Sequence, residues 1–295
     1  MQARAALALT AVALTAPALA HPPRGIVVAR DGTVYFSDLV RVRAIQPDGR
    51  VRVVRNARGA HIHALALSAD GALWGEQSAY DPADGGYREA IWRRSRGGRT
   101  AYRYGPTKRL ERGVGLLRDR KGCTWHLDQA FQGGPPLVHR KCRAKPAELL
   151  FGHAADDLRF RPGLVGDLSG TALDANGRLL FRHAGVLRRV APDGSAEVLA
   201  EGLDRGNFGL ALAPGGTVYL AEWENRRVAA VSGGKVRTAA RSEVGWGPSG
   251  VAWRGGTLYV LEASLHRAGE PDRVRVRRIA SNSDTVLATV TAAGR

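Results

Sequence analysis

The chain carries one short pattern six times. A tight turn containing glycine leads into a β-rich run, as in GTVYFSD (32–38), GTVYLAE (216–222) and GTLYVLE (256–262). The six turn glycines are Gly32, Gly71, Gly122, Gly177, Gly216 and Gly256, so the steps between them are 39, 51, 55, 39 and 40 residues. A period near 40 with two longer members is typical of arrays in which each repeat is a small antiparallel sheet.

Each repeat has room for four strands. An apolar segment such as GLALA (209–213) precedes the turn, a second strand follows it, and a third is clearest at RVAAV (227–231). A second turn, such as Pro47-Asp48-Gly49, then opens a fourth strand. Asp-Gly and Gly-Gly turns supply the positive φ angles that two-residue hairpins need. Six four-stranded units predict an all-β fold, a six-bladed β-propeller that forms a single domain over residues 21–295.

The first 20 residues have the features of a secretory signal peptide. Arg4 precedes the apolar run AALALTAVAL, and Ala18-Leu19-Ala20 offers a small-x-small cleavage site. The run is too short to span a bilayer, which takes ~20 apolar residues. We therefore expect a secreted or periplasmic protein with no transmembrane segment after cleavage. A retained anchor is the alternative.

The chain is strongly basic, with a formal net charge of +17. Such a charge favours polyanionic neighbours, for example an acidic envelope polymer. The arginines are scattered along the chain, which favours a solubilising surface instead. The absence of zinc-finger and RNA-recognition patterns argues against a specific nucleic-acid partner. The segment RVRVRR (273–278) predicts an outer strand whose arginine face discourages edge pairing.

One segment carries a family resemblance. YLAEWENRRVAAV (219–231) resembles the NHL repeat, in which an apolar strand, an acidic residue and an Asn-Arg-Val stretch follow one another. The whole array, residues 24–290, resembles the superfamily that includes NHL propellers and the senescence marker protein/gluconolactonase group. The resemblance implies a propeller, and the gluconolactonase group implies lactone hydrolysis with a bound metal.

The residues of that metal site are not reproduced. The group uses an acid in the first blade, an Asn directly before the glycine of a later first strand, and an Asp in the same place two strands on. Here Ser169, Phe208 and Ser249 precede the corresponding glycines. Asn207 stands one position early, which turns it to the other side of its strand.

The two cysteines provide a test of the strand register. In a hairpin folded midway between them, facing residues have numbers that sum to 265, and Cys123 and Cys142 satisfy this sum. An exported protein permits the bond. The sequence therefore predicts a Cys123–Cys142 disulfide, with two free buried thiols as the alternative.

Insertions gather on one face of the predicted propeller. Segments 78–90, 129–136, 151–166 and 263–273 all lie opposite the face that carries the Asp-Gly turns. Binding residues collect on such loops of a rigid scaffold. Candidate binding residues at this face are Tyr80, Asp128, His183, Asn207, Glu222 and Glu262, and most of them end a second strand together with Asp38 and Gln77. Acids in these positions can instead brace the arginines that follow, as Glu222 and Arg227 suggest.

The second repeat has the residue types for chemistry. His61 and His63 share one face of a strand, and Glu76 and Tyr80 leave the neighbouring strand at the same end. Imidazole and carboxylate side chains suit proton transfer or a divalent cation such as Ca²⁺, Zn²⁺ or Mg²⁺. Hydrogen-bonded structural histidines are the alternative, because no spacing fixes a third ligand.

Taken together, these features predict an exported NHL-like propeller that binds a small-molecule ligand or a protein partner on its loop-rich face. The alternative is a metal-assisted hydrolase of lactonase type, or a lyase, with its site at the mouth of the central channel and His61, His63 and Glu76 as catalytic residues.

Overall fold

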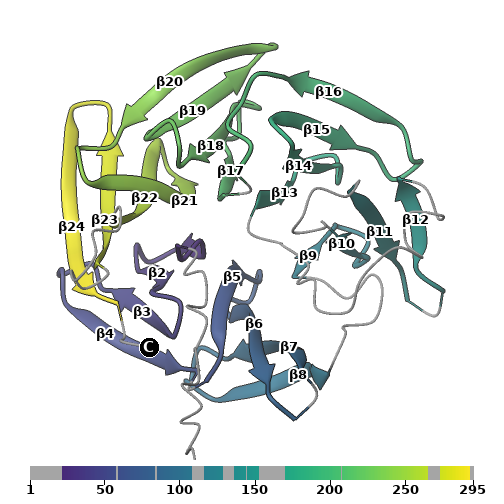
Figure 1. The fold of residues 1–295 in the computed structure, drawn as a ribbon, viewed down its shortest axis with the longest axis horizontal. Helices are drawn as coiled ribbons and strands as arrows, with labels where there is room; N and C mark the ends of the chain where they lie inside the picture. Colours follow the sequence, from purple (N-terminus) through teal and green to yellow (C-terminus); the bar gives the residue numbers. More distant parts are fainter. Residues whose placement is uncertain are drawn as a thin grey trace, which may run out of the picture.

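The computed structural model describes residues 22–57, 59–83, 85–107, 116–128, 136–143, 145–152, 170–206, 208–264 and 273–292. Six four-stranded antiparallel sheets lie around a common axis, as Figure 1 shows. The predicted six-bladed β-propeller is thereby confirmed. The six repeat glycines all have φ between 74° and 87°, as the turns require.

Each blade takes four consecutive strands. Blade one contains β1 (Ile26–Val28), β2 (Val34–Ser37), β3 (Arg41–Ile45) and β4 (Val51–Asn56), and blade two contains β5 (His61–Leu67), β6 (Leu73–Asp81), β7 (Gly86–Arg94) and β8 (Thr100–Thr107). Blade three contains β9 (Leu117–Arg118), β10 (Thr124–Asp128), β11 (Leu137–Lys141) and β12 (Glu148–Phe151), and blade four contains β13 (Thr171–Leu173), β14 (Leu179–His183), β15 (Val186–Val190) and β16 (Ala196–Ala200). Blade five contains β17 (Leu210–Leu212), β18 (Val218–Glu222), β19 (Arg227–Ser232) and β20 (Lys235–Arg241), and blade six contains β21 (Trp246–Arg254), β22 (Thr257–Ser264), β23 (Arg273–Ala280) and β24 (Ser283–Thr291).

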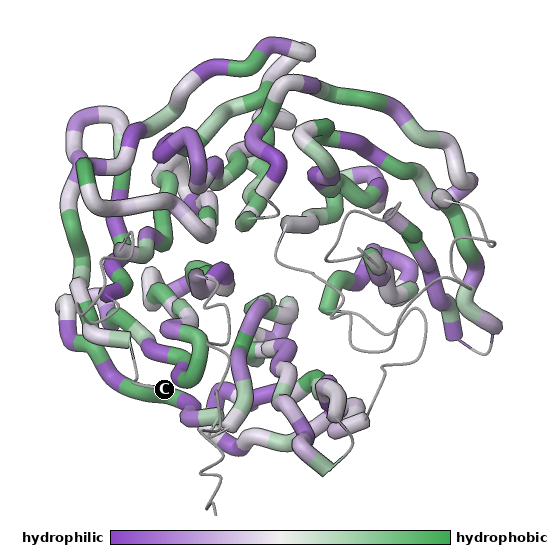
Figure 2. Tube along the Cα trace, viewed as in Figure 1, coloured by the Kyte–Doolittle hydropathy of each residue, from purple (hydrophilic) through white to green (hydrophobic). Residues whose placement is uncertain are grey.

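The strand order within each blade follows the chain, so the first strand is innermost. Inner strands of neighbouring blades contact one another, for example β1 with β5 and β21. Figure 2 shows hydrophobic residues along these inner strands and alternating hydrophilic and hydrophobic residues on the outer ones. Because successive strands are antiparallel, the turns between first and second strands share one face of the ring, called here the turn face. The connections between second and third strands share the other, the loop face.

Apolar side chains hold neighbouring blades together. Among the described residues, five of the six junctions contain clusters of six to nine buried apolar residues. Phe36, Phe181 and Val260 are fully buried in three of these clusters. Burial of one such side chain contributes about 1.5–3 kcal/mol. The remaining junction, between blades two and three, has one buried apolar residue in its cluster among the described residues.

The ring closes without exchanging a strand between the first and last blades. Blades one and six each own four strands, and Phe36 of β2 packs with Leu261 of β22 and Val276 of β23. At Gly250 a Cβ atom would lie 2.3 Å from the backbone oxygen of Arg24, so only glycine allows the inner strands to approach this closely. Side-chain packing therefore latches the propeller.

The predicted disulfide is present between Cys123 and Cys142. β10 and β11 pair from Thr124 opposite Lys141 to Asp128 opposite Leu137, which is the register derived from the cysteine positions.

One sequence prediction is wrong. The segment RVRVRR does not form an outer strand, because β23 pairs with β22 on one side and β24 on the other. Val274 and Val276 pack against blade one, whereas Arg275 and Arg277 are buried on the opposite side of the sheet. The arginines serve internal ion pairs rather than edge protection.

No helix in the part of the chain that the structure describes is long and apolar enough to cross a membrane. The residues of the expected signal peptide lie outside the described ranges.

Candidate functional site

Side chains of β6 point alternately to the two faces of blade two, one of which is apolar and the other polar. Leu73 belongs to the apolar cluster shared with blade one, and Gly75 faces Trp92 of the same cluster. Because side chains alternate along a strand, Glu76 and Ser78 point the other way, toward blade three. This face of blade two carries most of the catalytic candidates.

The junction between blades two and three is polar where the other five are apolar. Its apolar cluster has one buried member among the described residues, Ile91, packed with Trp74 and Leu116. The opposing sheet of blade three turns Trp125 and Leu127 toward blade four, so its alternate residues face blade two. Buried polar side chains on the two facing sheets are Glu76, Ser78 and Glu89 from blade two and Thr124, His126 and His139 from blade three. We call this group the junction cluster.

The two predicted histidines lie beside the cluster. A β-bulge at His63 interrupts the pairing of β5 with β6 and re-aims the side chain. His63 Nε2 is 2.9 Å from Ser78 Oγ, and the rings of His61 and His63 are 6.0 Å apart. His61 pairs with Ser78 across the strands. The structure thus brings His61 and His63 to the strand that carries Glu76, as the sequence predicted.

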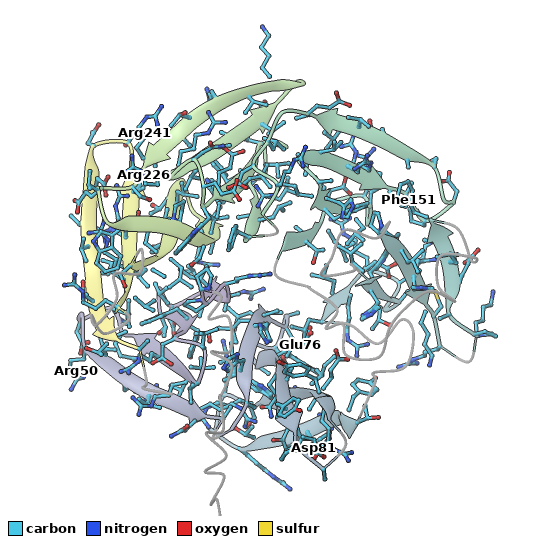
Figure 3. The ribbon with its side chains drawn as sticks, viewed as in Figure 1. Arg50, Glu76, Asp81, Phe151, Arg226 and Arg241 are labelled. Carbon is cyan, nitrogen blue, oxygen red and sulfur yellow. A yellow bond between two sulfur atoms is a disulfide. The ribbon has the colours of Figure 1, made fainter. Side chains whose placement is uncertain are left out.

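Glu76 has an unusual environment for a carboxyl group. Glu76 is 2% exposed, and its Oε2 atom has no hydrogen-bond partner among the described residues. Burial, and secondarily the neighbouring carboxylate of Glu89, raises the pKa of Glu76 well above its ordinary value. This environment favours the neutral, protonated form of the carboxyl group over the carboxylate. Figure 3 shows Glu76 nearer the centre of the ring than Asp81, which ends the same strand.

Tyr80 continues the same face of β6 toward solvent. Its side chain is 56% exposed, and its ring packs edge-on against Tyr87 at 5.5 Å between centroids. An exposed aromatic pair therefore lies two residues beyond Ser78 on the long β6–β7 hairpin, which takes up the predicted insertion 78–90. Most of insertions 129–136, 151–166 and 263–273 lies outside the described residues.

The acids at the ends of second strands are engaged in ion pairs. The Asp38 carboxylate is 2.6 Å from Arg43 Nε, and Glu222 pairs with Arg227. Glu262 accepts hydrogen bonds from Arg275 Nε and Arg277 Nη1 at 2.6 and 2.7 Å. All three carboxylate side chains are completely shielded from solvent. This geometry corresponds to the bracing role that the sequence offered as an alternative to ligand binding.

The other predicted binding residues have varied positions. Gln77 accepts a hydrogen bond from Arg55 Nη2 at 2.6 Å. His183 is half-buried, and burial together with Arg188 lowers its pKa, so the imidazole is neutral. Asp128 ends β10, and Asn207 lies outside the described residues.

A cavity of ≈ 260 Å³ lies among the inner strands, lined mainly by aliphatic side chains such as Leu65 and Leu210 and by Arg24. The guanidinium of Arg24 lies 5.2 Å from the centre of the Phe208 ring, which stacks on Trp223. Burial, and secondarily the charge of Arg182, lowers the pKa of Arg24 to about 10. Even so, Arg24 is a cation at neutral pH.

These residues do not suit a divalent cation at the channel entrance. Arg24 and Phe208 each precede the glycine that leads into an inner strand, and Ser249 precedes Gly250 within β21. They present a guanidinium, an aromatic ring and a fully buried hydroxyl that contacts the carbonyl oxygen of Leu261. Hard cations take oxygen ligands, and a guanidinium repels them. Elsewhere in the described ranges, no three His, Cys, Asp or Glu side chains are arranged to hold a metal ion.

Sequence reasoning missed several members of these sites. Glu89 lies within the predicted insertion 78–90 and was not identified as a functional residue. Arg24 precedes the first strand and belongs to no recognisable motif. His126 and His139 do carry a signal, because residues whose numbers sum to 265 pair across the hairpin, and these two are opposite one another. The cysteine register could therefore have identified them.

Comparisons with known proteins place the fold. No family model matches the chain, and no curated protein matches it by sequence. A gluconolactonase from Xanthomonas campestris is similar in structure, with a TM-score of 0.57 and 18% identity over 81% of this chain and 83% of that one. Regucalcin from Agrobacterium tumefaciens, a calcium-binding protein, has a TM-score of 0.54 and 16% identity over 84% of each chain. The chain shares the six-bladed fold of these gluconolactonase and regucalcin structures.

Proposed function

We propose that this protein is a hydrolase that opens a lactone or a related cyclic ester at the junction cluster, on the loop face. The observation that carries the proposal is the position of Glu76, a buried carboxyl group with a raised pKa. It lies on the same face of β6 as Ser78, which contacts His63. Neutral carboxylic acids at neutral pH are uncommon, and they occur where a proton has to be donated. The fold shared with a gluconolactonase supports the same reaction class.

The two groups have complementary roles in hydrolysis. His63, positioned by its contact with Ser78, accepts a proton from a water molecule whose oxygen bonds to the carbonyl carbon of the substrate. The ring C–O bond then breaks, and Glu76 gives its proton to the departing alkoxide oxygen. The protonated imidazole returns its proton to the Glu76 carboxylate through solvent. Lactone and water are consumed, and one hydroxy acid is formed.

The surrounding residues suit a compact polar substrate. Tyr80 and Tyr87 offer exposed ring surface against which the apolar side of a cyclic substrate can pack. Burial is the main cause of the raised pKa of Glu76, and the neighbouring Glu89 adds to it. Glu89 is therefore a positioning residue for the proton rather than a proton donor itself.

The fold relatives imply a metal, and the chain's residues limit where one can bind. The channel-entrance residues Arg24, Phe208 and Ser249 do not fit a divalent cation, as described above. The hydrolytic steps are therefore assigned to the chain's own Glu76 and His63.

The test is hydrolysis of a panel of five- and six-membered lactones by purified protein, followed as acid release. We expect turnover that falls at least about a hundredfold in Glu76→Gln and in His63→Gln, consistent with the usual contribution of general acids and bases. Glu148→Gln is the matched control, because Glu148 is an exposed acid on β12. No turnover of any lactone, or equal activity in Glu76→Gln and wild type, would contradict the proposal.

A second candidate function is ligand or partner binding on the loop face without catalysis. It is favoured by the buried acids at the ends of the second strands. Asp38, Glu222 and Glu262 form ion pairs with arginines and so stiffen the scaffold. Lactones that bind without being hydrolysed, with affinity unaffected by Glu76→Gln, would favour this function over hydrolysis.

We further propose that the mature domain works outside the cytoplasm, as a secreted or periplasmic protein. The disulfide between Cys123 and Cys142 supports this location, because such bonds persist in oxidising compartments. Mass spectrometry of protein from culture supernatant or periplasm, with a mature terminus at His21, is the expected result. Recovery of the protein only from the cytoplasm with residue 1 retained is the opposite result.

A further inference from the structure

A second cavity lies on the turn face, away from the junction cluster. It has a volume of ≈ 650 Å³ and is lined mainly by residues of blades one and two, together with Arg254 of blade six. The residues lining it come from the turn ends of β1, β3, β4, β5 and β7. Pockets of 300–1,000 Å³ are typical of small-molecule sites, so this cavity has the size of a ligand site.

Arginines dominate the charge of this cavity. Five of its lining residues are arginines, and one, Asp31, is acidic. The five are Arg30, Arg52, Arg94, Arg96 and Arg254. We call the cavity the arginine pocket. Asp31 is ionised, because a hydrogen bond from the Thr33 backbone N–H lowers its pKa, so five positive charges face one negative charge.

Three of the pocket arginines, Arg30, Arg52 and Arg96, are exposed, and the other two are partly buried. Arg94 donates hydrogen bonds to the carbonyl oxygen of Gly98 and to Thr100 Oγ1. Arg254 Nη2 lies 3.4 Å from the carbonyl oxygen of Arg30. These acceptors are neutral, so they orient the guanidinium groups without compensating their charge. Among the described residues, none of the five arginines forms an ion pair within 4.0 Å.

A further donor lines the same cavity. Gln46 Nε2 is buried and has no hydrogen-bond partner among the described residues. A buried amide nitrogen without an acceptor is unfavourable, so this donor is available to an oxygen atom of a ligand. The pocket therefore combines excess positive charge with an unfilled donor.

We propose that the arginine pocket binds a small polyvalent oxyanion, a molecule with two or more phosphate or carboxylate groups. A concave surface lined by one sign of charge concentrates the opposite ion, and the planar guanidinium matches phosphate and carboxylate oxygens in pairs. The limited volume and the three contributing blades favour a compact ligand over a long polymer. The site lies on the face opposite the proposed hydrolytic centre and does not depend on that function.

The test is calorimetric titration of the purified protein with pyrophosphate and with citrate at low salt. We expect one site per chain, and the tighter of the two probes identifies phosphate or carboxylate as the recognised group. Arg52→Gln combined with Arg96→Gln removes two exposed pocket cations whose side chains form no hydrogen bond with the described residues. Loss of two charge-assisted contacts is expected to weaken binding about a hundredfold.

The matched control is Arg237→Gln combined with Arg241→Gln. Both residues are exposed on β20 of blade five, where Figure 3 shows Arg241 at the rim of the ring, and the change in net charge is the same. Affinity that falls in the pocket variant and stays within twofold of wild type in the control supports the proposal. Equal losses in both variants, no binding of either probe to wild type, or binding of an acidic polysaccharide alone would overturn it. Circular dichroism of both variants checks that the fold is retained.

Discussion

The disulfide of blade three gives a stability prediction whose size follows from the structure. Cys123 and Cys142 are 19 residues apart, so the bond closes a loop of about 20 residues in the unfolded chain. In the chain-entropy model, closing such a loop stabilises the fold by about 3 kcal/mol at 25 °C. Replacing both cysteines by alanine should therefore lower the folding equilibrium constant about a hundredfold.

Urea unfolding, followed by circular dichroism, measures this loss. Wild-type protein in reductant is the control, because it loses the cross-link while keeping the side-chain volume of Cys123, which is 3% exposed. We expect reduced wild type to lose most of the stability that the double variant loses. A difference between oxidised and reduced wild type below about 0.5 kcal/mol would refute the reasoning, as would two free thiols in the native protein.

The raised pKa of Glu76 means that the folded state holds this proton more tightly than the unfolded chain, so stability is lost as pH rises from the ordinary value of 4.5 through the folded pKa. In Glu76→Gln the Tm should fall less over this pH range than the Tm of wild type. Parallel curves of Tm against pH for variant and wild type would contradict this prediction. Gly75→Ala would place a Cβ atom 2.1 Å from the Trp92 ring, and we expect urea unfolding to show a loss of about 1–3 kcal/mol of stability. Gly215→Ala is the control, because a Cβ atom there would have no neighbour within 4 Å. Because the apolar contact between blades two and three is sparse, the backbone amides of β9 should exchange their hydrogens faster than those of the inner strands β17 and β21. Equal protection of all inner strands would argue against this.

The sequence predicted the architecture because the repeat is local. Turn glycines and the strands around them depend on residues within one blade, so their spacing yields the number of blades. The disulfide was predictable for the same reason, since hairpin register follows from residue numbers alone. The pairing of Glu222 with Arg227 was also readable, because five residues separate them across one hairpin.

Contacts between blades were not predictable in this way. The role of β23 was missed because the pattern of alternating Arg and Val does not show that Glu262, from the neighbouring strand, neutralises Arg275 and Arg277. The polar junction between blades two and three depends on which strand faces meet. The arginine pocket combines Arg52, Arg94 and Arg254 from three blades, which the sequence separates by up to 202 residues. Closure of the ring brings them together.

The protonation state of Glu76 at neutral pH is the measurement that bears most directly on the proposed function. Infrared difference spectroscopy of wild type against Glu76→Gln reports the C=O stretch of a protonated carboxyl group. If Glu76 is the proton donor, wild type shows such a band at neutral pH and the variant lacks it. A carboxylate signal at this position, with no protonated band to lose, would contradict the assignment of Glu76 as the proton donor.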